Sequence, residues 1–196
     1  MNKLRYVIAL ILLVFHPPAV LLWVAIHPFA KFWRKLGPVW TYALLGIPVL
    51  GYMVAAWLFR RALLGKDLGT SLFTLFPAAA CVAAALLLNR ERRKHLDFGT
   101  LSGIPELSVK RYPGTLLTEG VYGRIRHPRY VEVHLFIFGY AGFANYVGAY
   151  AVVFLSLPLI YLVILLEERE LRQRFGAAYE DYCRRVPRFL PRKKTI

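Results

Sequence analysis

Residues 129–166 read RYVEVHLFIFGYAGFANYVGAYAVVFLSLPLIYLVILL, two apolar runs separated by a short polar turn at Asn145 and Tyr146. A helix needs about 20 apolar residues to cross the hydrocarbon core of a bilayer. An open sheet in lipid would leave backbone groups unpaired, so such runs form helices. The stretch therefore predicts a tight antiparallel hairpin of two membrane helices, at 129–145 and 147–166.

Three more apolar runs precede this hairpin, at 6–26, 38–59 and 71–88. The 196-residue chain is 58% hydrophobic, above the roughly half that is usual for soluble domains. The first run is too long for the core of a signal peptide, so we expect it to be retained. The sequence thus predicts an all-α integral membrane protein with about five transmembrane helices.

This pattern divides the chain into two predicted regions. Residues 1–95 would form an N-terminal three-helix transmembrane region, and residues 96–196 a catalytic region. The second region would combine a cytoplasmic loop, the helical hairpin and a cytosolic tail helix. The loop at 95–122 is rich in Gly and Pro, which excludes a long helix and favours a structured loop or a re-entrant flap.

The distribution of charge predicts the orientation. The chain carries 26 Lys and Arg against 11 Asp and Glu, a net charge of +15. Nine of these basic residues lie within 90–129 and nine follow residue 166, so both stretches are expected in the cytoplasm of a multi-pass protein of a prokaryotic cytoplasmic membrane. Such loops suit an anionic lipid surface, and no motif for binding nucleic acid is present.

The entry to the fourth predicted helix carries Arg126, His127, Pro128 and Tyr130. Pro128 suits a first helical turn, which places Arg126 and His127 at the membrane surface. These residues could form a simple interfacial anchor or part of a functional site. Glu132 and His134 follow at membrane depth, where a charged side chain costs roughly 2.5–3.5 kcal/mol without a partner. Glu132 could instead pair with Arg129 three residues earlier.

A second polar group lies at the end of the fifth helix. Glu167 and Glu168 are adjacent carboxylates there and oppose the helix dipole. The hairpin returns them to the membrane face of Arg126 and His127, which predicts one shared pocket or, alternatively, a structural ion-pair network. Aromatic residues at 175, 179 and 182 have helical spacing and are expected to pack. No paired Cys or His spacing predicts a metal ligand set.

As a set, these motifs resemble the isoprenylcysteine carboxyl methyltransferase and phospholipid methyltransferase superfamily of integral membrane enzymes. The matching features are Arg-His-Pro-x-Tyr at 126–130, the hairpin, the two glutamates, Phe-Gly-x-x-Tyr-x-x-Tyr at 175–182 and Val-Pro-Arg-Phe at 186–189. The resemblance covers about the last 80 residues. One departure is Glu132, since the family usually has glycine there.

The resemblance implies S-adenosylmethionine as cofactor and methyl transfer to a lipid-like acceptor that enters sideways from the bilayer. It implies cofactor binding by His127, Tyr130, Glu167 and Glu168, and catalytic roles for Arg126 and Arg188. An amine or hydroxyl acceptor would also need a base, for which the residue types offer Glu132 or His127. Isoprenylcysteine carboxylates rank slightly above phospholipid or other lipid amines as acceptors. The alternatives are an NADPH-dependent membrane reductase and a non-catalytic membrane scaffold.

Overall fold

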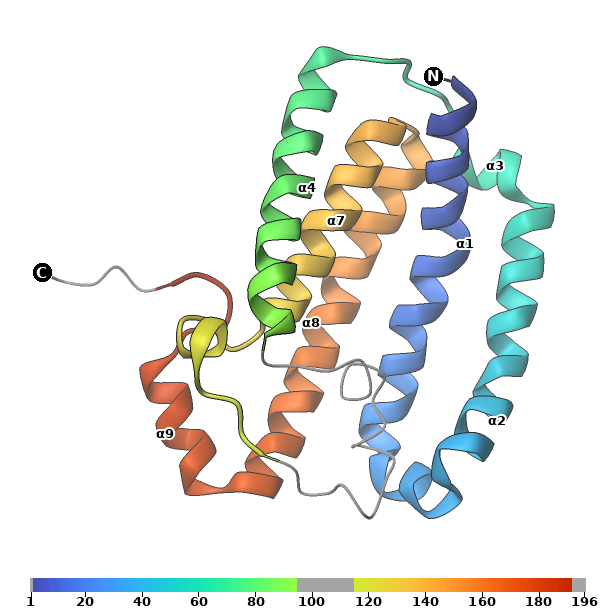
Figure 1. The fold of residues 1–196 in the computed structure, drawn as a ribbon. Helices are drawn as coiled ribbons and strands as arrows, with labels where there is room; N and C mark the ends of the chain where they lie inside the picture. The colour runs from blue at the N-terminus through green and yellow to red at the C-terminus, as the bar shows by residue number, and fades with distance from the viewer. Residues whose placement is uncertain (1, 95–114, 192–196) are drawn as a thin grey trace, which may run out of the picture.

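The computed structural model describes residues 2–94 and 115–191, which form helices and no strand. The N-terminal part contains α1 (Asn2–Ile26), the short η1 (His27–Phe29), α2 (Ala30–Leu58), α3 (Arg60–Leu64) and α4 (Leu72–Arg93). The C-terminal part contains η2 (Gly120–Gly123), α7 (Pro128–Ala144), α8 (Val147–Phe175) and α9 (Ala177–Arg185). Figure 1 shows the long helices lying side by side, with α9 folded against the end of α8.

Three segments are long and apolar enough to cross a membrane: Asn2–Leu58, Leu72–Arg93 and Val147–Phe175. The first of them joins α1 and α2 through η1. The prediction of an all-α membrane protein is therefore confirmed. The finer prediction of five spans is not, since α7 has only 17 residues, the lower limit for crossing a bilayer.

The two ends of the helix bundle carry different parts of the chain (Figure 1). One end holds the N-terminus, α3 and the turn between α7 and α8, and the other holds η1 and α9. Arg5 is 1% exposed and fastens the first end, because its Nε donates to the Ala144 carbonyl oxygen at 3.0 Å and its guanidinium pairs with Asp67. Asn145, in the left-handed conformation, donates to the Gly69 carbonyl oxygen at 2.8 Å.

Helices α1 and α2 each contain a local irregularity. The predicted span at 38–59 begins earlier, at Ala30, and is kinked at Gly37, where φ is 76°. Helix α1 contains Pro17 and Pro18. A proline removes the donor to the carbonyl four residues earlier, and the Tyr52 hydroxyl supplies a substitute, donating to the Leu13 carbonyl oxygen at 3.0 Å.

The tail after residue 166, for which the sequence predicts one helix that continues the fifth span, is divided into two helices. Helix α8 ends at Phe175 because Gly176 adopts φ 52° and ψ −126°, a conformation that glycine accepts far more readily than other residues. Helix α9 then ends at Arg185, close to Val186 and Pro187, where the sequence predicts the end of the tail helix. Tyr179, Tyr182 and Val186 form a buried cluster, so the predicted packing role of the tail aromatics is confirmed.

The pair Gly139 and Gly142 predicts close helix packing within the hairpin, but the structure places this close packing between α7 and α4. A Cβ at Gly139 would lie 2.6 Å from Val82 Cγ2 and 2.9 Å from the Ala78 carbonyl oxygen. Most of the predicted loop at 95–122, and the predicted boundary between the two regions, lie outside the described residues.

Candidate functional site

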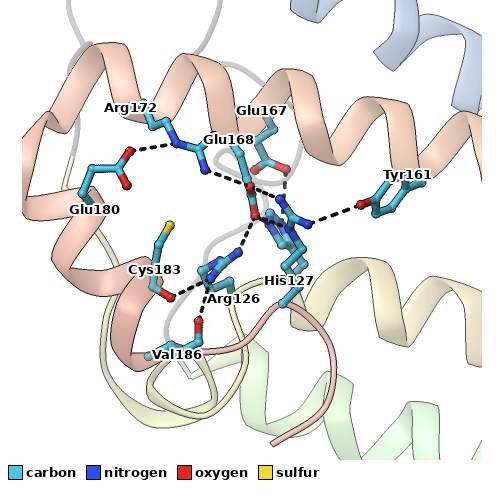
Figure 2. A network of polar contacts seen from close by, with 10 residues as sticks. Arg126, His127, Tyr161, Glu167, Glu168, Arg172, Glu180, Cys183 and Val186 are labelled. Carbon is cyan, nitrogen blue, oxygen red and sulfur yellow. Dashed lines mark hydrogen bonds and ion pairs between the residues drawn. The ribbon is translucent and has the colours of Figure 1, made fainter.

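The candidate site is centred on Glu168, whose side chain is completely buried. One carboxylate oxygen accepts hydrogen bonds from Arg126 Nη2 at 2.9 Å and Arg188 Nε at 2.9 Å, and lies 3.1 Å from His127 Nε2. The other accepts from Arg188 Nη2 at 2.8 Å and Arg172 Nη2 at 3.4 Å. Figure 2 shows this network. The predicted convergence of Arg126 and His127 with Glu168 is thus confirmed.

The backbone of the tail holds the entry to α7 in place. The amides of Arg126 and His127 donate to the carbonyl oxygens of Pro187 and Arg188, at 2.8 and 3.1 Å. Arg126 Nη1 also donates to the Val186 carbonyl oxygen at 2.7 Å. The residues on either side of the buried carboxylate are therefore fixed to each other before any ligand arrives, which is the preorganisation that a binding site requires.

Arg188 connects Glu168 to Tyr161. Its fork of nitrogens binds both oxygens of Glu168, and its Nη1 donates to the Tyr161 hydroxyl at 3.3 Å. Hydrogen bonding to Glu168 raises the pKa of Arg188 above its ordinary value. The side chain is one-third exposed. It therefore presents a permanent positive charge at the edge of the site.

Two hollows lie beside this cluster. The first, here called the polar cleft, has a volume of about 160 Å³ and is lined by residues that include Trp23, His27, His127, Glu167, Tyr179 and Tyr182. The second, here called the apolar groove, has a volume of about 450 Å³ and is lined by residues that include His134, Phe138, Leu157, Tyr161, Ile164 and Phe189. Tyr130 lines both hollows, so it lies where they adjoin.

Several buried polar atoms of the polar cleft have no hydrogen-bond partner among the described residues. They include the Tyr179 hydroxyl, Glu167 Oε2 and His27 Nε2, whereas His27 Nδ1 lies 3.5 Å from Glu170 Oε2. Glu167 Oε2 lies 3.8 Å from His127 Nδ1, too far for a good hydrogen bond. Burial raises the pKa of Tyr179, so its hydroxyl stays protonated. Because unpaired buried groups are costly, these atoms indicate a polar ligand.

The charge around Glu168 is unbalanced. Three guanidinium groups, those of Arg126, Arg172 and Arg188, contact one carboxylate. Glu180 offsets part of the excess, since it accepts from Arg172 Nε at 2.9 Å on the exposed side. The remaining positive charge favours an anionic group at the site, because arginine forks match carboxylate and phosphate oxygens.

Glu132 does not join this cluster. It is 5% exposed and faces α4, where Arg92 Nε and Nη2 donate to its two oxygens at 2.6 and 3.2 Å. Asn89 Nδ2 donates to the same carboxylate. The suggested pairing with Arg129 was therefore wrong, and nothing places Glu132 as a base at the cleft. Asn89 and Arg92 were missed, although their three-residue spacing on one helix face could have indicated a shared partner.

Among residues 2–94 and 115–191, no group of three or more His, Cys, Asp and Glu side chains is placed to hold a metal ion. No protein-family model matches the chain. No solved structure matches it either.

Two curated proteins are similar to part of the chain. It is 34% identical over 77 residues to the nickel-cobalt-cadmium resistance protein NccN of Alcaligenes xylosoxydans xylosoxydans, covering 39% of this chain and 36% of that protein. It is 39% identical over 83 residues to the cobalt-zinc-cadmium resistance protein CzcN of Cupriavidus metallidurans, covering 42% of this chain and 38% of that protein. The matched segments thus span little more than a third of each relative's length.

These relatives correct the functional prediction. Both are named for resistance to metals and neither is named a methyltransferase. The predicted methyltransferase activity was therefore wrong on this comparison, together with its ranking of isoprenylcysteine carboxylates over lipid amines. The prediction came from the resemblance of the sequence motifs to a methyltransferase superfamily, and a resemblance of this kind does not by itself specify a reaction.

Proposed function

We propose that this protein is a helical membrane component of resistance to divalent transition-metal cations, and that it acts through the site centred on Glu168. The similarity to proteins named for nickel, cobalt, zinc and cadmium resistance supports the physiological role. The observation that supports the site is a fully buried carboxylate held by three arginines where a polar cleft meets an apolar groove.

The ligand of this site is a molecule with an anionic head and an apolar tail. The excess of guanidinium over carboxylate around Glu168 favours a phosphate or carboxylate near Arg188. The apolar groove has the volume for part of a hydrocarbon chain, and it is lined mainly by aliphatic and aromatic side chains. A membrane lipid has both features and reaches such a groove sideways from the bilayer.

S-adenosylmethionine, which the family resemblance implies, is the small ligand that we propose to test first in the polar cleft. Its ammonium group is complementary to Glu167, and its carboxylate to the arginines. The cleft of about 160 Å³ is smaller than the roughly 300 Å³ at which small-molecule pockets begin, so the described residues suit the amino-acid end of this molecule. Calorimetric titration with S-adenosylhomocysteine tests this, and the absence of heat would overturn it.

The proposal includes a topology. Helices α1, α2, α4, α7 and α8 would all cross a prokaryotic cytoplasmic membrane, with the Glu168 site in the cytoplasm. Two facts support it. Helix α7 packs against α1, α4 and α8. The last turns of α4 and α8, which carry Arg90, Arg92, Arg93, Arg172 and Arg174, point toward the same end of the bundle (Figure 1). Two variants, Gly69→Cys and Glu180→Cys, test this topology with a thiol reagent that does not cross the membrane. In whole cells we expect the reagent to label Gly69→Cys and not Glu180→Cys.

Deletion of the gene from its native host tests the physiological role. The deletion strain should grow at lower maximal concentrations of Ni²⁺, Co²⁺, Zn²⁺ or Cd²⁺ than its parent, and the wild-type gene should restore growth. Tolerance to Mg²⁺ and to high NaCl serves as the control and should not change. Unchanged tolerance to all four transition-metal cations in the deletion strain would overturn the proposal.

A further inference from the structure

A second candidate site lies inside the helix bundle, where α1 and α7 pack in antiparallel directions. Arg5 contacts the Ala144 carbonyl oxygen near one end of this interface. Near the other end, the guanidinium of Arg129 lies 4.9 Å from the centre of the Trp23 ring. These two contacts fix how the helices are aligned along their length.

This alignment brings His16 and His134 to the same level. His16 follows Arg5 by eleven residues, and His134 precedes Ala144 by ten, both on the order of 15 Å along a helix. Residues with helical spacing line one face of each helix and agree with this alignment. They are residues 5, 9, 12, 16, 20 and 23 on α1, and residues 144, 141, 137, 134 and 130 on α7.

The packing on either side of the pair supports this register. Leu12 and Ala9 belong to one buried cluster with Ile137 and Ala141. Val20 belongs to the next cluster, which includes Tyr130. The register of the two helices places both imidazoles between these clusters, where a positive charge on one ring would oppose a positive charge on the other.

The chemistry of the two rings favours metal binding. His134 Nδ1 lies 2.7 Å from the Tyr130 carbonyl oxygen, and a carbonyl can only accept, so Nδ1 carries the proton. In the neutral ring the lone pair is then on Nε2, which is buried without a hydrogen-bond partner among the described residues. The Nε2 atom of His16 is buried in the same way. A ring that donates one N–H to a backbone carbonyl and presents its other nitrogen is oriented as metal-ligating histidines are.

We propose that His16 and His134 together bind one transition-metal cation of the class that imidazole prefers, such as Zn²⁺, Co²⁺ or Ni²⁺. The apolar groove adjoins His134 and leaves room for water or a small anion to complete the four ligands of such an ion. The choice of ions rests on the proposed role in metal resistance, whereas the position of the site does not. The ion site is separate from the Glu168 cluster.

The test uses the full chain, purified in detergent, stripped with EDTA and titrated with Co²⁺ as the probe. We expect one Co²⁺ per chain with the visible absorption of a nitrogen-ligated ion, displaced by Zn²⁺. Outer-shell partners of a metal contribute roughly 10–100-fold in affinity, so His16→Gln and His134→Gln should each weaken binding by at least that factor. His27→Gln removes another imidazole near the end of the same helix and should leave the spectrum unchanged.

Wild-type protein that takes up no Co²⁺ would overturn the inference, and so would unchanged binding in the His16→Gln and His134→Gln variants. Loss of binding in His27→Gln would also overturn it, since the ion would then lie elsewhere. If the two variants fail to fold, X-ray absorption of the Zn²⁺-loaded wild type decides, with two imidazole ligands expected. Metal tolerance in cells is measured separately, so a protein that confers tolerance without binding Co²⁺ would contradict the ion site alone.

Discussion

Arg188 binds both oxygens of Glu168, at 2.9 and 2.8 Å, although Gly176 interrupts the helix between the two residues. The contact returns the end of the tail to the start of α7, where the Arg126 and His127 amides bond to the Pro187 and Arg188 carbonyls. One buried carboxylate thus joins α8, the tail and the entry to α7.

Replacing Arg188 by Gln should loosen this junction. Hydrogen bonds to charged groups contribute about 1.5–3 kcal/mol, so the Arg126 and His127 amides should exchange with deuterium roughly 10–100-fold faster. Arg188→Lys should give an intermediate effect, because lysine keeps the charge but not the fork. Arg184→Gln, at an exposed pair with Asp181, is the matched control. Unchanged protection of both amides in Arg188→Gln would contradict the assignment.

The buried pair of Arg92 and Glu132 should couple α4 to α7. Removing one partner of a buried ion pair costs about 3–5 kcal/mol, because the other charge is left without compensation. Arg92→Leu and Glu132→Leu should therefore each destabilise the protein strongly, and the double variant should be less destabilised than the sum of the two. Thermal unfolding in detergent measures this cycle. Additive effects would show that the two side chains do not depend on each other.

Gly148 is predicted to be intolerant of a side chain. A Cβ there would lie 2.0 Å from the Leu63 carbonyl oxygen and 2.7 Å from Leu64 Cα, both in the backbone of α3. Gly148→Ala should lower stability by about 1–3 kcal/mol, which is typical of overpacking. Gly46→Ala is the control, since a Cβ at Gly46 meets nothing within 4 Å and alanine is the better helix former. Equal melting temperatures for the two variants would contradict this packing.

Asp67 should contribute stability that depends on pH. The backbone N–H of Gly69 and, next among the favourable contacts, Arg5 hold the pKa of Asp67 below its ordinary value of 3.8. A lowered pKa in the folded state gives stability that is present above the unfolded pKa and is lost as pH falls through the folded pKa. Asp67→Asn should therefore melt lower than wild type at pH 7, and this difference should shrink below about pH 3.8. Asp181→Asn is the control, and a difference that does not vary with pH would contradict this account.

Much of the fold could be predicted from local sequence patterns. The apolar runs and the turn at Asn145 predicted the hairpin, and the hairpin in turn predicted that Glu168 returns to Arg126 and His127. Those inferences needed only spacing along the chain. They succeeded because a bilayer limits the chain to helices and allows few connections between them.

The parts that could not be predicted depend on contacts between distant helices. The ion-pair partner of Glu132 is Arg92, 40 residues earlier in α4. Spacing along a single helix predicted only Arg129 as a partner. Gly139 was assigned to the hairpin because small residues favour close packing, but their spacing does not say which neighbouring helix approaches. The break at Gly176 was missed since the flanking residues favour helix on both sides.

The function was harder to predict from the sequence than the fold or the position of the site. Residue types around Glu168 indicated a site for a charged ligand, and the structure brings those residues together. The reaction assigned to that site came from a family resemblance, and the relatives named for metal resistance contradict it. The chemistry of a site limits its ligands more closely than it limits its physiological role.

Replacing Glu168 by Gln tests the central claim most directly. Glutamine keeps the shape of the side chain but leaves Arg126, Arg172 and Arg188 around a neutral amide. Glu180→Gln, at an exposed carboxylate that contacts Arg172, is the matched control. Each gene is returned to the deletion strain, membrane protein levels are matched by immunoblot, and growth is measured in rising Co²⁺. We predict that Glu180→Gln restores tolerance and Glu168→Gln does not, whereas full restoration by Glu168→Gln at equal protein levels would contradict the account.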